Sequence, residues 1–244
     1  MQQTFLLYID ILGFGDLCEA MDDKVKQIYD EVLAMRTRGQ QTYSVTIFSD
    51  TILVRNLGIL DPLSEIQFLI EFFRLLQDRL ARLAVFLRSI ITLGYFHEER
   101  SDDVYLAYGP AVVSAYKAEK RIQSVGLFLY PSCAEYNKFY PQILVPEHGL
   151  YFIFTLESLE RLDDTVYVSS EILTETDQFT GLPGDISFLS QIHACASSLP
   201  CDSARNKHKA YLAYYTQRHP NLFKALLADN FSLAVINEEH DWQQ

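Results

Sequence analysis

The sequence predicts an α+β protein in which one mixed β-sheet carries helices on one face and is followed by a helical C-terminal extension. Short apolar runs alternate with amphipathic helical patterns up to about residue 145. Helical patterning dominates again from Ile186 onward. Of the 244 residues, 49% are hydrophobic and 21% are charged, which is typical of a chain that buries an ordinary core. We therefore expect residues 1–145 to form the core, and residues 146–244 to complete the same domain with edge strands and helices.

The N-terminal elements follow from local patterns. Residues 4–10 are almost wholly apolar and end at Asp10, shortly before Gly13, as expected for a buried strand that enters a turn. Apolar residues then recur at helical spacing over residues 16–38, and Gly39 is a suitable helix stop. A strand, a turn and a helix are the predicted order.

The rest of the chain alternates between strands and helices. Two β-rich runs meet at Ser49 and Asp50, which predicts a hairpin tip, and Pro62 suits the first turn of a long helix. The predicted elements are strands at 43–48 and 51–54, a helix at 62–83, strands at 86–95 and 104–108 around a loop at 98–103, a helix at 110–124, a strand at 127–130 and a short helix from Pro131. Further on, we expect edge strands at 151–155 and 165–168, a polar loop at 175–185, and helices from Ile186.

Composition limits the possible partners. The chain has 20 basic and 32 acidic residues, and a net charge of −12 repels a polyanion, so we expect no nucleic-acid partner. A small phosphate ligand is compatible, because a metal ion and a few amides outweigh the global field locally. The sequence has no run of 18 apolar residues and no basic leader, so we expect a cytoplasmic protein without a membrane segment. Four scattered cysteines are expected to be free thiols.

Two aspartates at strand ends indicate the chemistry. Asp10 ends the first strand, and Asp50 lies 40 residues later at the predicted hairpin tip. If these elements are neighbours in the sheet, both carboxylates project from one edge, and a divalent cation such as Mg²⁺ or Mn²⁺ would stabilise the pair. The turn at Leu12, Gly13 and Phe14 precedes a helix N-terminus, where amides favour phosphate. Taken singly, each aspartate also suits a structural role, as a helix cap or a turn residue.

Four motifs in the same order resemble those of class III nucleotidyl cyclases. They span about residues 4–140, and the nearest resemblance is to the pyrimidine cyclase branch of bacterial Pycsar anti-phage defence. The motifs are Tyr8-Ile9-Asp10-Ile11-Leu12-Gly13-Phe14-Gly15, Ile47-Phe48-Ser49-Asp50-Thr51, Arg88-Ser89-Ile90-Ile91-Thr92-Leu93-Gly94 and Tyr108-Gly109-Pro110-Ala111-Val112-Val113-Ser114-Ala115-Tyr116-Lys117-Ala118-Glu119.

The resemblance implies a palm or ferredoxin-like cyclase fold and an intramolecular reaction. A pyrimidine nucleoside triphosphate, UTP or CTP with UTP favoured, would become the 3′,5′-cyclic monophosphate and pyrophosphate. The product would be a second messenger in anti-phage defence, bound by a separate effector protein. The resemblance also implies a head-to-tail homodimer with active sites shared across the interface.

The resemblance also assigns roles to matching residues. Two Mg²⁺ or Mn²⁺ ions per site would be held by three ligands, Asp10, Asp50 and the Ile11 carbonyl. The other assigned residues share contact with the substrate: they are the amides of Leu12, Gly13 and Phe14 for the phosphates, Arg88 and Lys117 for transition-state charge, and Thr46 for the base. Tyr43 is a further candidate for a base contact, and an ordinary strand aromatic is the simpler interpretation. Arg88 also suits a surface charge at a strand end.

Departures from the family pattern leave alternatives open. Val113 stands where these cyclases carry a transition-state Asn, and Lys117 replaces an Arg, which loses the bidentate fork. Thr46 and Val104 replace the purine-selecting Lys and Asp, which fits a smaller pyrimidine. The first alternative is a catalytically inactive cyclase-like module that binds nucleotide or a partner.

A second alternative is a palm enzyme that forms a dinucleotide. Such an enzyme would carry a Gly-Gly-Asp/Glu-Glu-Phe hairpin where this chain has Phe48-Ser49-Asp50-Thr51. His97 is a candidate ligand or acid–base group, although a histidine at a loop edge more simply serves the surface.

Overall fold

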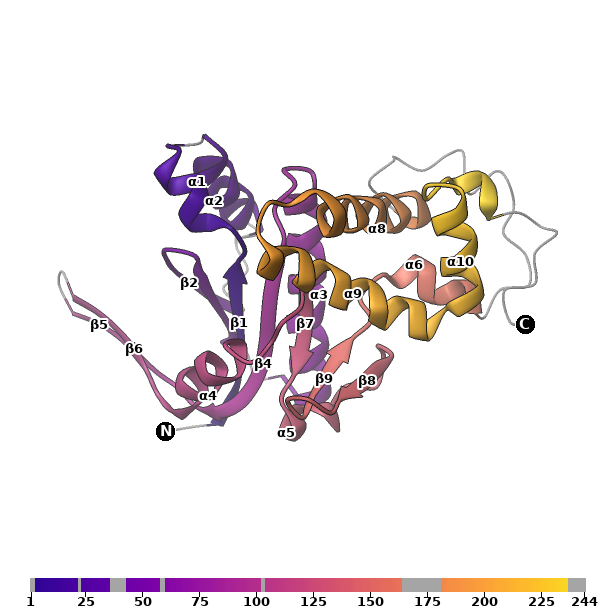
Figure 1. Cartoon of the computed structure of the whole chain (residues 1–244). Coiled ribbons are helices and arrows are strands. Elements are labelled where there is room, and N and C mark those ends of the chain that lie inside the picture. Colours follow the sequence, from indigo (N-terminus) through magenta and orange to yellow (C-terminus); the bar gives the residue numbers. More distant parts are fainter. Residues whose placement is uncertain are drawn as a thin grey trace. The chain divides into compact units, whose positions relative to one another are not determined.

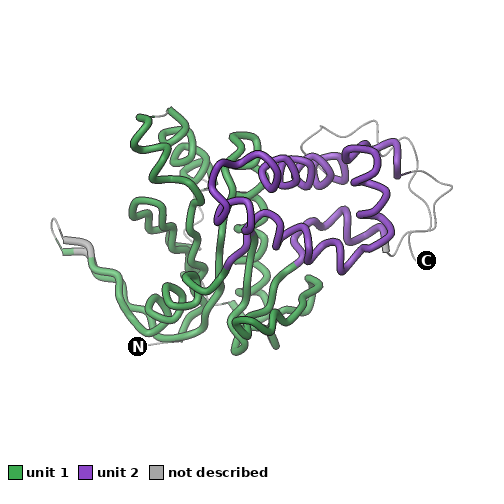
Figure 2. The backbone as a smooth tube through the Cα atoms, viewed as in Figure 1, with its two compact units in different colours: residues 1–122, 126–153 green, residues 123–125, 154–244 purple. Residues whose placement is uncertain are grey.

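The computed structural model describes residues 3–21, 23–35, 43–57, 60–101, 104–163 and 181–236, without the side chains of residues 100, 104 and 105. The chain forms two compact units, which Figure 2 colours separately. The first comprises residues 1–122 and 126–153, and the second comprises residues 123–125 and 154–244.

A seven-stranded mixed sheet forms the centre of the first unit (Figure 1). Its strand order is β2-β3-β1-β4-β7-β9-β8. Neighbours β4 and β7 run parallel, and the other neighbouring pairs run antiparallel. The strands are β1 (Gln3–Ile11), β2 (Tyr43–Phe48), β3 (Thr51–Asn56), β4 (Leu87–Tyr95), β7 (Gly126–Leu129), β8 (Gln142–Val145) and β9 (Leu150–Ile153). The predicted mixed sheet with packed helices is confirmed. Strand β8 ends at residue 145 and β9 follows it, and both belong to the first unit.

One face of the sheet packs against α3 (Pro62–Ala81) and α2 (Lys24–Ala34). Helix α3 begins after Asp61, whose carboxylate accepts hydrogen bonds from the amides of Leu63 and Ser64 at 3.0 and 3.2 Å. The predicted helix over residues 16–38 is instead two helices, α1 (Phe14–Glu19) and α2, as far as the described residues reach. Alternate residues of β1 point into this core, because side chains in a strand alternate between faces.

The opposite face of the sheet is covered by α4 (Pro110–Glu119) (Figure 1). The buried alanines of α4 allow a close approach, and the Thr92 hydroxyl donates a hydrogen bond to the Ala111 carbonyl at 3.1 Å. Gly109 has a φ of 147°, and a Cβ there would lie 2.4 Å from the Tyr95 carbonyl oxygen, so only glycine fits this start of the helix. The expectation of helices on one face was therefore wrong.

A separate two-stranded ribbon precedes α4. Strands β5 (His97–Ser101) and β6 (Val104–Tyr108) pair antiparallel, with Glu98 opposite Ala107. Residues 98–101 were predicted as loop because they are polar. The polar side chains of this ribbon are either exposed, as at Glu99, or held by an ion pair, as at Glu98, so the ribbon lacks the apolar pattern that predicts a strand.

The second unit is helical. Its described helices are α6 (Glu157–Glu160), α8 (Gly181–Ser198), α9 (Asp202–Arg218) and α10 (Pro220–Ala228), with short 3₁₀ turns η1 (Arg161–Asp163) and η2 (Leu233–Val235). The buried Tyr215 hydroxyl accepts hydrogen bonds from the amides of Thr155 and Leu156 at 3.1 and 3.2 Å. The helical extension is confirmed. The loop predicted at 175–185 is wrong for residues 181–185, which open α8, since Pro183 is tolerated in a first turn.

Two further expectations concern this part of the chain. The edge strand predicted at 165–168 lies outside the described residues. Within the described ranges, none of the helices combines the length and the apolar character that a membrane crossing needs.

Candidate active site

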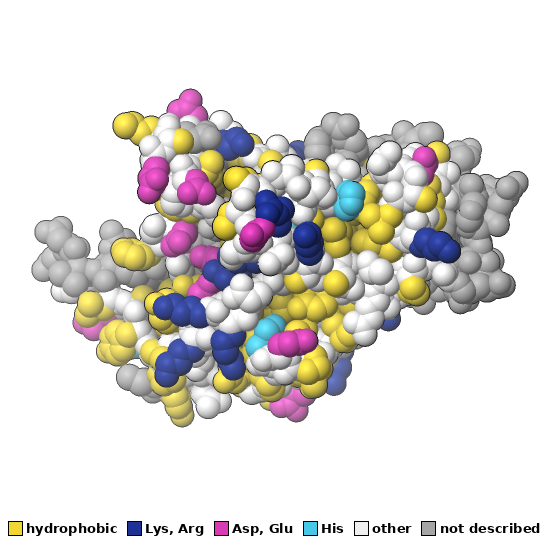
Figure 3. Space-filling model, viewed as in Figure 1, with side chains coloured by type: hydrophobic (Ala, Val, Ile, Leu, Met, Phe, Trp, Pro, Cys, Tyr) yellow, Lys and Arg dark blue, Asp and Glu magenta, His cyan; other side chains and the backbone are white. Residues whose placement is uncertain are grey.

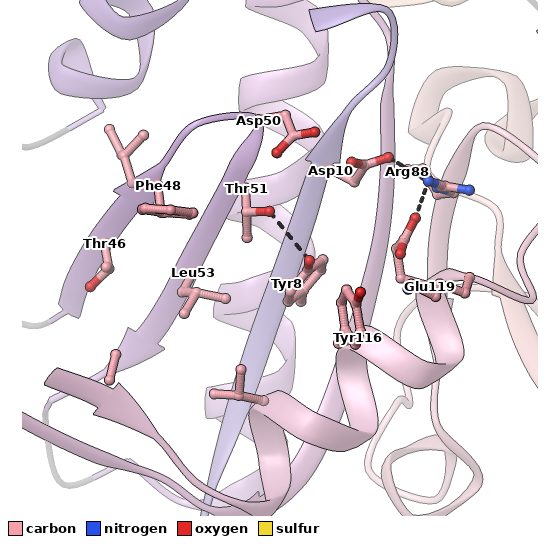
Figure 4. A pocket seen from close by; sticks show the side chains of 14 residues that line it. Tyr8, Asp10, Thr46, Phe48, Asp50, Thr51, Leu53, Arg88, Tyr116 and Glu119 are labelled. Atoms are coloured by element: carbon pink, nitrogen blue, oxygen red, sulfur yellow. Dashed lines mark hydrogen bonds and ion pairs between the residues drawn. The ribbon is translucent and has the colours of Figure 1, made fainter. Parts of the chain in front are cut away.

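A cavity of about 870 Å³ opens in the first unit, between the sheet and α4. The charged residues of its described lining are Asp10, Asp50, Arg88, Glu119 and Lys120, and the remaining lining residues are apolar or carry a hydroxyl. Figure 4 shows the first four of these gathered at one end, whereas Thr46, Phe48 and Leu53 lie at the other. The cavity therefore has a charged end and an uncharged end.

Sheet register brings the two aspartates to the same end. Asp10 of β1 pairs directly with Thr51 of β3, and the Ile11 amide donates a hydrogen bond to the Asp50 carbonyl at 3.0 Å. Ser49, with a φ of 53°, turns the chain just before Asp50. The expected neighbourhood of the first strand and the hairpin is confirmed. The role of the two aspartates and the Ile11 carbonyl as metal ligands stays a prediction.

Arg88 links two carboxylates at this end. It is the cross-strand neighbour of Asp10, and its Nη2 and Nε lie 2.7 and 3.1 Å from Asp10 Oδ2. Nη2 also forms an ion pair with Glu119, and Nη1 donates to the Ile122 carbonyl at 3.1 Å. The side chains of Arg88, Asp10 and Glu119 are only 12, 14 and 9% exposed. Removing one partner would leave an uncompensated charge that is largely withdrawn from water, so we expect such a change to lower the free energy of unfolding.

Tyr8 lines the cavity together with these acids. Its hydroxyl forms a hydrogen bond with Thr51 Oγ1 at 3.2 Å. Burial is the largest cause of a raised pKa of the Tyr8 phenol; the hydrogen bond with Thr51 opposes it, and the carboxylates of Glu119, Asp10 and Asp50 add to it. The phenol is therefore protonated at neutral pH.

The charged end suits a hard divalent cation. Asp10 and Asp50 provide carboxylate oxygens, and the guanidinium that already bridges Asp10 and Glu119 shows that this place requires positive charge. In the part of the chain that the structure describes, no cluster of three or more His, Cys, Asp or Glu side chains is arranged around a metal position. Mg²⁺ commonly takes one or two protein carboxylates and completes its shell with phosphate oxygens and water. The residues fit an ion held jointly by protein and substrate.

The turn after β1 supports the predicted phosphate cradle only in part. The Leu12 amide donates a hydrogen bond to the Phe86 carbonyl at 3.0 Å, so its assignment to a phosphate is wrong for this structure. Gly13 adopts a φ of 75° and caps α1, a helix of only six residues. The Phe14 side chain is buried in the core beside Tyr29. Phosphate binding by the Gly13 and Phe14 amides stays a prediction.

The two predicted base contacts on β2 lie in different surroundings. Thr46 lines the cavity, as expected. Tyr43 does not line it and instead packs against Phe68 and Phe72, while its hydroxyl donates to the Met35 carbonyl. Residues 43 and 46 face opposite sides because strand side chains alternate. The assignment of Tyr43 to the base was therefore wrong.

Helix α4 presents a different face to the cavity from the one predicted. Val112, Tyr116, Glu119 and Lys120 line it, at the spacing of one helical face. Lys117, assigned to transition-state charge, is exposed and absent from the described lining, as is Val113. Figure 3 shows basic side chains gathered over α4, where Lys117, Lys120 and Arg121 are all exposed.

Sequence reasoning missed Glu119 and Lys120. Both residues lie on the same helical face as Val112, so assigning that face of α4 to the cavity would have identified them. The ammonium of Lys120 lies 4.1 Å from the centre of the Tyr116 ring.

Two further residues named from the sequence do not add to the described site. His97 lies outside the cavity lining and contacts Glu99 and Tyr108. The side chain of Val104 is not among those described.

Comparisons with known sequences give one curated match. No family model matches the chain. The class 1 fructose-1,6-bisphosphatase of Chlorobium phaeovibrioides (strain DSM 265 / 1930) is 27% identical over 137 residues, which cover 55% of this chain and 38% of that enzyme. The chain thus spans less than half the length of the curated relative that it matches.

Comparisons with solved structures give cyclase domains. The adenylyl cyclase CyaB from P. aeruginosa is 12% identical, with a TM-score of 0.45 over 63% of this chain and 95% of that one. The guanylate cyclase domain of RhGC from Catenaria anguillulae, in complex with GTP, is 11% identical, with a TM-score of 0.45 over 63% and 96%. A class III adenylyl cyclase-like ATP-binding protein from Pseudomonas aeruginosa is 13% identical, with a TM-score of 0.40 over 57% and 35%. The roles proposed below rest on the residues of this chain.

Proposed function

We propose that this protein is a metal-dependent nucleotidyl cyclase that acts on a pyrimidine nucleoside triphosphate, UTP or CTP. The ribose 3′-oxygen attacks the α-phosphorus of the same molecule, the bond from that phosphorus to the bridging oxygen breaks, and pyrophosphate leaves. The 3′-hydroxyl proton passes to solvent, and the product is the 3′,5′-cyclic monophosphate. The observation that carries the proposal is the convergence of Asp10 and Asp50 at the charged end of a cavity of about 870 Å³.

The charged end would bind the triphosphate. Asp10 and Asp50 would hold Mg²⁺ or Mn²⁺, two ions per site, and such ions lower the pKa of a bound hydroxyl and stabilise phosphate charge. Lys120 and Arg88 line the same cavity and add positive charge. Because Arg88 shares Asp10 with any bound cation, ion binding would loosen the Arg88 contact and leave the guanidinium closer to the phosphates.

The uncharged end would bind the base. Thr46, Phe48 and Leu53 provide one hydroxyl and two apolar side chains. The purine-selecting Lys and Asp of the resembling cyclases correspond to Thr46 and Val104, neither of which carries a charge. These residues support a pyrimidine over ATP or GTP.

An exposed apolar rim supports a dimer, and the family resemblance suggests what the product does. Phe48 is 79% exposed, and Val113 and Tyr116 are also exposed although they lie at or beside the cavity. A second copy of the chain would cover such a rim and bring its own Lys117 to the site. We place the product as a cytoplasmic second messenger of anti-phage defence, read by a separate effector.

One observation favours a second candidate. Arg88 already pairs with Asp10 and Glu119, and Lys117 and Val113 are absent from the described cavity lining. A site neutralised in this way suits an inactive module that binds nucleotide without turnover.

Incubation with each of the four ribonucleoside triphosphates and Mn²⁺, followed by a pyrophosphate assay, separates the two candidates. The cyclase predicts pyrophosphate with UTP or CTP, and a cyclic monophosphate by mass spectrometry. Nucleotide binding with no pyrophosphate from any of the four would instead identify the inactive module.

A further inference from the structure

The two basic side chains of the described cavity lining have different surroundings. The Arg88 guanidinium forms ion pairs with Asp10 and Glu119, so its charge is compensated by the protein itself. The ammonium of Lys120 instead lies 4.1 Å from the centre of the Tyr116 ring. Among the residues that the structure describes, no carboxylate forms an ion pair with Lys120. Lys120 therefore brings to the cavity a positive charge that no described acid balances.

The contact with the ring holds the Lys120 ammonium in place but leaves its charge available. Tyr116 and Lys120 are four residues apart, the spacing at which two side chains meet on one helical face. The Lys120 amide donates a hydrogen bond to the Tyr116 carbonyl at 3.4 Å, so the helical geometry of α4 reaches residue 120. An aromatic face attracts a cation without neutralising it, and the three N–H donors of an ammonium exceed what one ring can accept. Donors therefore remain for an anion in the cavity.

The position of Tyr116 places this ammonium at the charged end of the cavity. Val112, Tyr116, Glu119 and Lys120 form the α4 part of the lining. Figure 4 shows Tyr116 and Glu119 projecting from α4 at the end where Asp10 lies. Because Lys120 directly follows Glu119 and its ammonium rests on the Tyr116 ring, it belongs to this end. The triphosphate of the proposed substrate would occupy the same place.

We propose that Lys120 contacts the phosphate chain of the nucleotide and stabilises the charge of the leaving pyrophosphate, and that Tyr116 is a positioning residue that holds the Lys120 ammonium. This inference rests on the proposed function, and it assigns Lys120 to the same chain as Asp10. When the bond from the α-phosphorus to the bridging oxygen breaks, negative charge develops on pyrophosphate, and an ammonium donates charge-assisted hydrogen bonds to it. Unlike Arg88, Lys120 has no described ion pair to break before it does so.

The first test is steady-state pyrophosphate release from UTP and CTP by variants of Lys120. Lys120→Met keeps an apolar stem of similar length but removes the charge, so we expect kcat/KM to fall by about 10- to 100-fold, as for a hydrogen bond to a charged group. Lys120→Arg keeps the charge and should retain most of the activity. Arg121→Met is the matched control, because Arg121 is the next residue, basic and exposed, but absent from the described lining. Equal kcat/KM in Lys120→Met and Arg121→Met would overturn the inference.

The role of Tyr116 is tested by keeping or removing its ring. Tyr116→Phe retains the ring, so we expect the kcat/KM of wild type. Tyr116→Leu removes the ring, and we expect a decrease of about two- to fivefold, as for an exposed cation–π contact. Because Tyr116 acts through Lys120, the same substitution should have no further effect in the Lys120→Met background. An equal decrease in both backgrounds would contradict the positioning role.

Mixing two variants tests the placement of Lys120 in the same chain as Asp10. In a mixture of Lys120→Met and Asp10→Asn, every site would lack one of the two residues, so we expect no more activity than the sum of the two variants measured alone. Recovery of activity in this mixture would show that Lys120 serves the site of a second copy, and it would overturn the assignment to one chain.

Failure of the proposed function gives a different result. In that case wild type releases no pyrophosphate from any of the four nucleotides. The dissociation constant for UTP in the presence of Mn²⁺, measured by calorimetry, then takes the place of kcat/KM, and Lys120→Met should bind UTP about tenfold more weakly than Arg121→Met. Equal dissociation constants in these two variants would overturn the inference there as well.

Discussion

Two partly buried guanidinium–carboxylate clusters of the first unit have similar pairings but occupy different places. Arg88 joins Asp10 and Glu119, and all three side chains line the cavity. Arg55 joins Glu98, and neither residue belongs to the described lining, although Thr46, which Glu98 holds, does. Burial and pairing alone therefore do not identify a reacting group.

The difference teaches what each cluster contributes. Under the proposed function, acids that face the cavity contact a cation and a substrate, and their pairing with Arg88 is one state of that site. Glu98 lies outside the described lining and contacts it through the Thr46 hydroxyl. Removing the guanidinium should destabilise the fold in both clusters, but we expect only the first to contribute to the reaction rate.

The largest expected effect is on turnover at the cavity-facing acids. Asp10→Asn and Asp50→Asn each remove a ligand charge while keeping the side-chain shape, and we expect losses of about 1,000-fold or more, as when a contact to transition-state charge is removed. Steady-state pyrophosphate release measures this. Asp30→Asn, at an exposed helical ion pair with Lys26, is the control and should retain activity. Near wild-type turnover in Asp50→Asn would contradict the metal assignment.

The second prediction compares the stability that the two clusters provide. Arg88→Met leaves Asp10 and Glu119 buried without their cation, so we expect the free energy of unfolding to fall by about 3–5 kcal/mol. Arg55→Met should cost about 1–3 kcal/mol, since that pair is more exposed and Ser44 and Thr46 still donate to Glu98. Urea unfolding provides both values. Mn²⁺ should restore part of the loss in Arg88→Met and none in Arg55→Met; equal responses to Mn²⁺ would remove the distinction between the clusters.

The third prediction tests whether the first cluster is completed by a partner chain. If Lys117 serves the site of a second copy, Asp10→Asn and Lys117→Ala should each be nearly inactive, and a mixture of the two should regain activity by forming one intact shared site. Pyrophosphate release from the mixture, against each variant alone, measures this. A Lys117→Ala variant with full activity would exclude the shared site.

The smallest effect concerns a carboxylate far from both clusters. Burial raises the pKa of Asp78 to about 6 despite the nearby Arg74 and Arg82. The folded chain holds this proton more tightly than the unfolded chain, so the Asp78 contribution to stability falls as pH rises from about 4 to 6. Asp78→Asn should flatten the decrease in melting temperature over this window, whereas the exposed Asp30→Asn should leave it unchanged. A slope that Asp78→Asn does not alter would contradict the raised pKa.

Much of the sheet could be predicted from the sequence because its strands have strong local signals. The apolar run before Asp10 and the paired runs around Ser49 and Asp50 set the strands and placed both carboxylates at one sheet edge. The fold of residues 98–101 could not be predicted in this way, since polar residues that are exposed or ion-paired lack an apolar pattern. The division of residues 16–38 into two helices was likewise hidden within one helical periodicity.

The site was predictable only where position along the chain decides orientation. Asp10 and Asp50 follow from strand ends, but Tyr43 and Thr46 required the side of β2 that faces the cavity, which depends on packing partners. The same limit applies to α4, where the helical phase brings Glu119 and Lys120 to the cavity in place of Lys117. Hydrogen bonds between distant residues, such as the one from Thr46 to Glu98, have no sequence signal.

The most direct test of the central claim is a titration with Mn²⁺, followed by electron paramagnetic resonance, in the presence of a non-hydrolysable UTP analogue. If Asp10 and Asp50 jointly hold the ions above the triphosphate, wild type should bind two Mn²⁺ ions per site and Asp50→Asn should lose at least one of them. Equal Mn²⁺ stoichiometry and affinity in wild type and Asp50→Asn would contradict the claim.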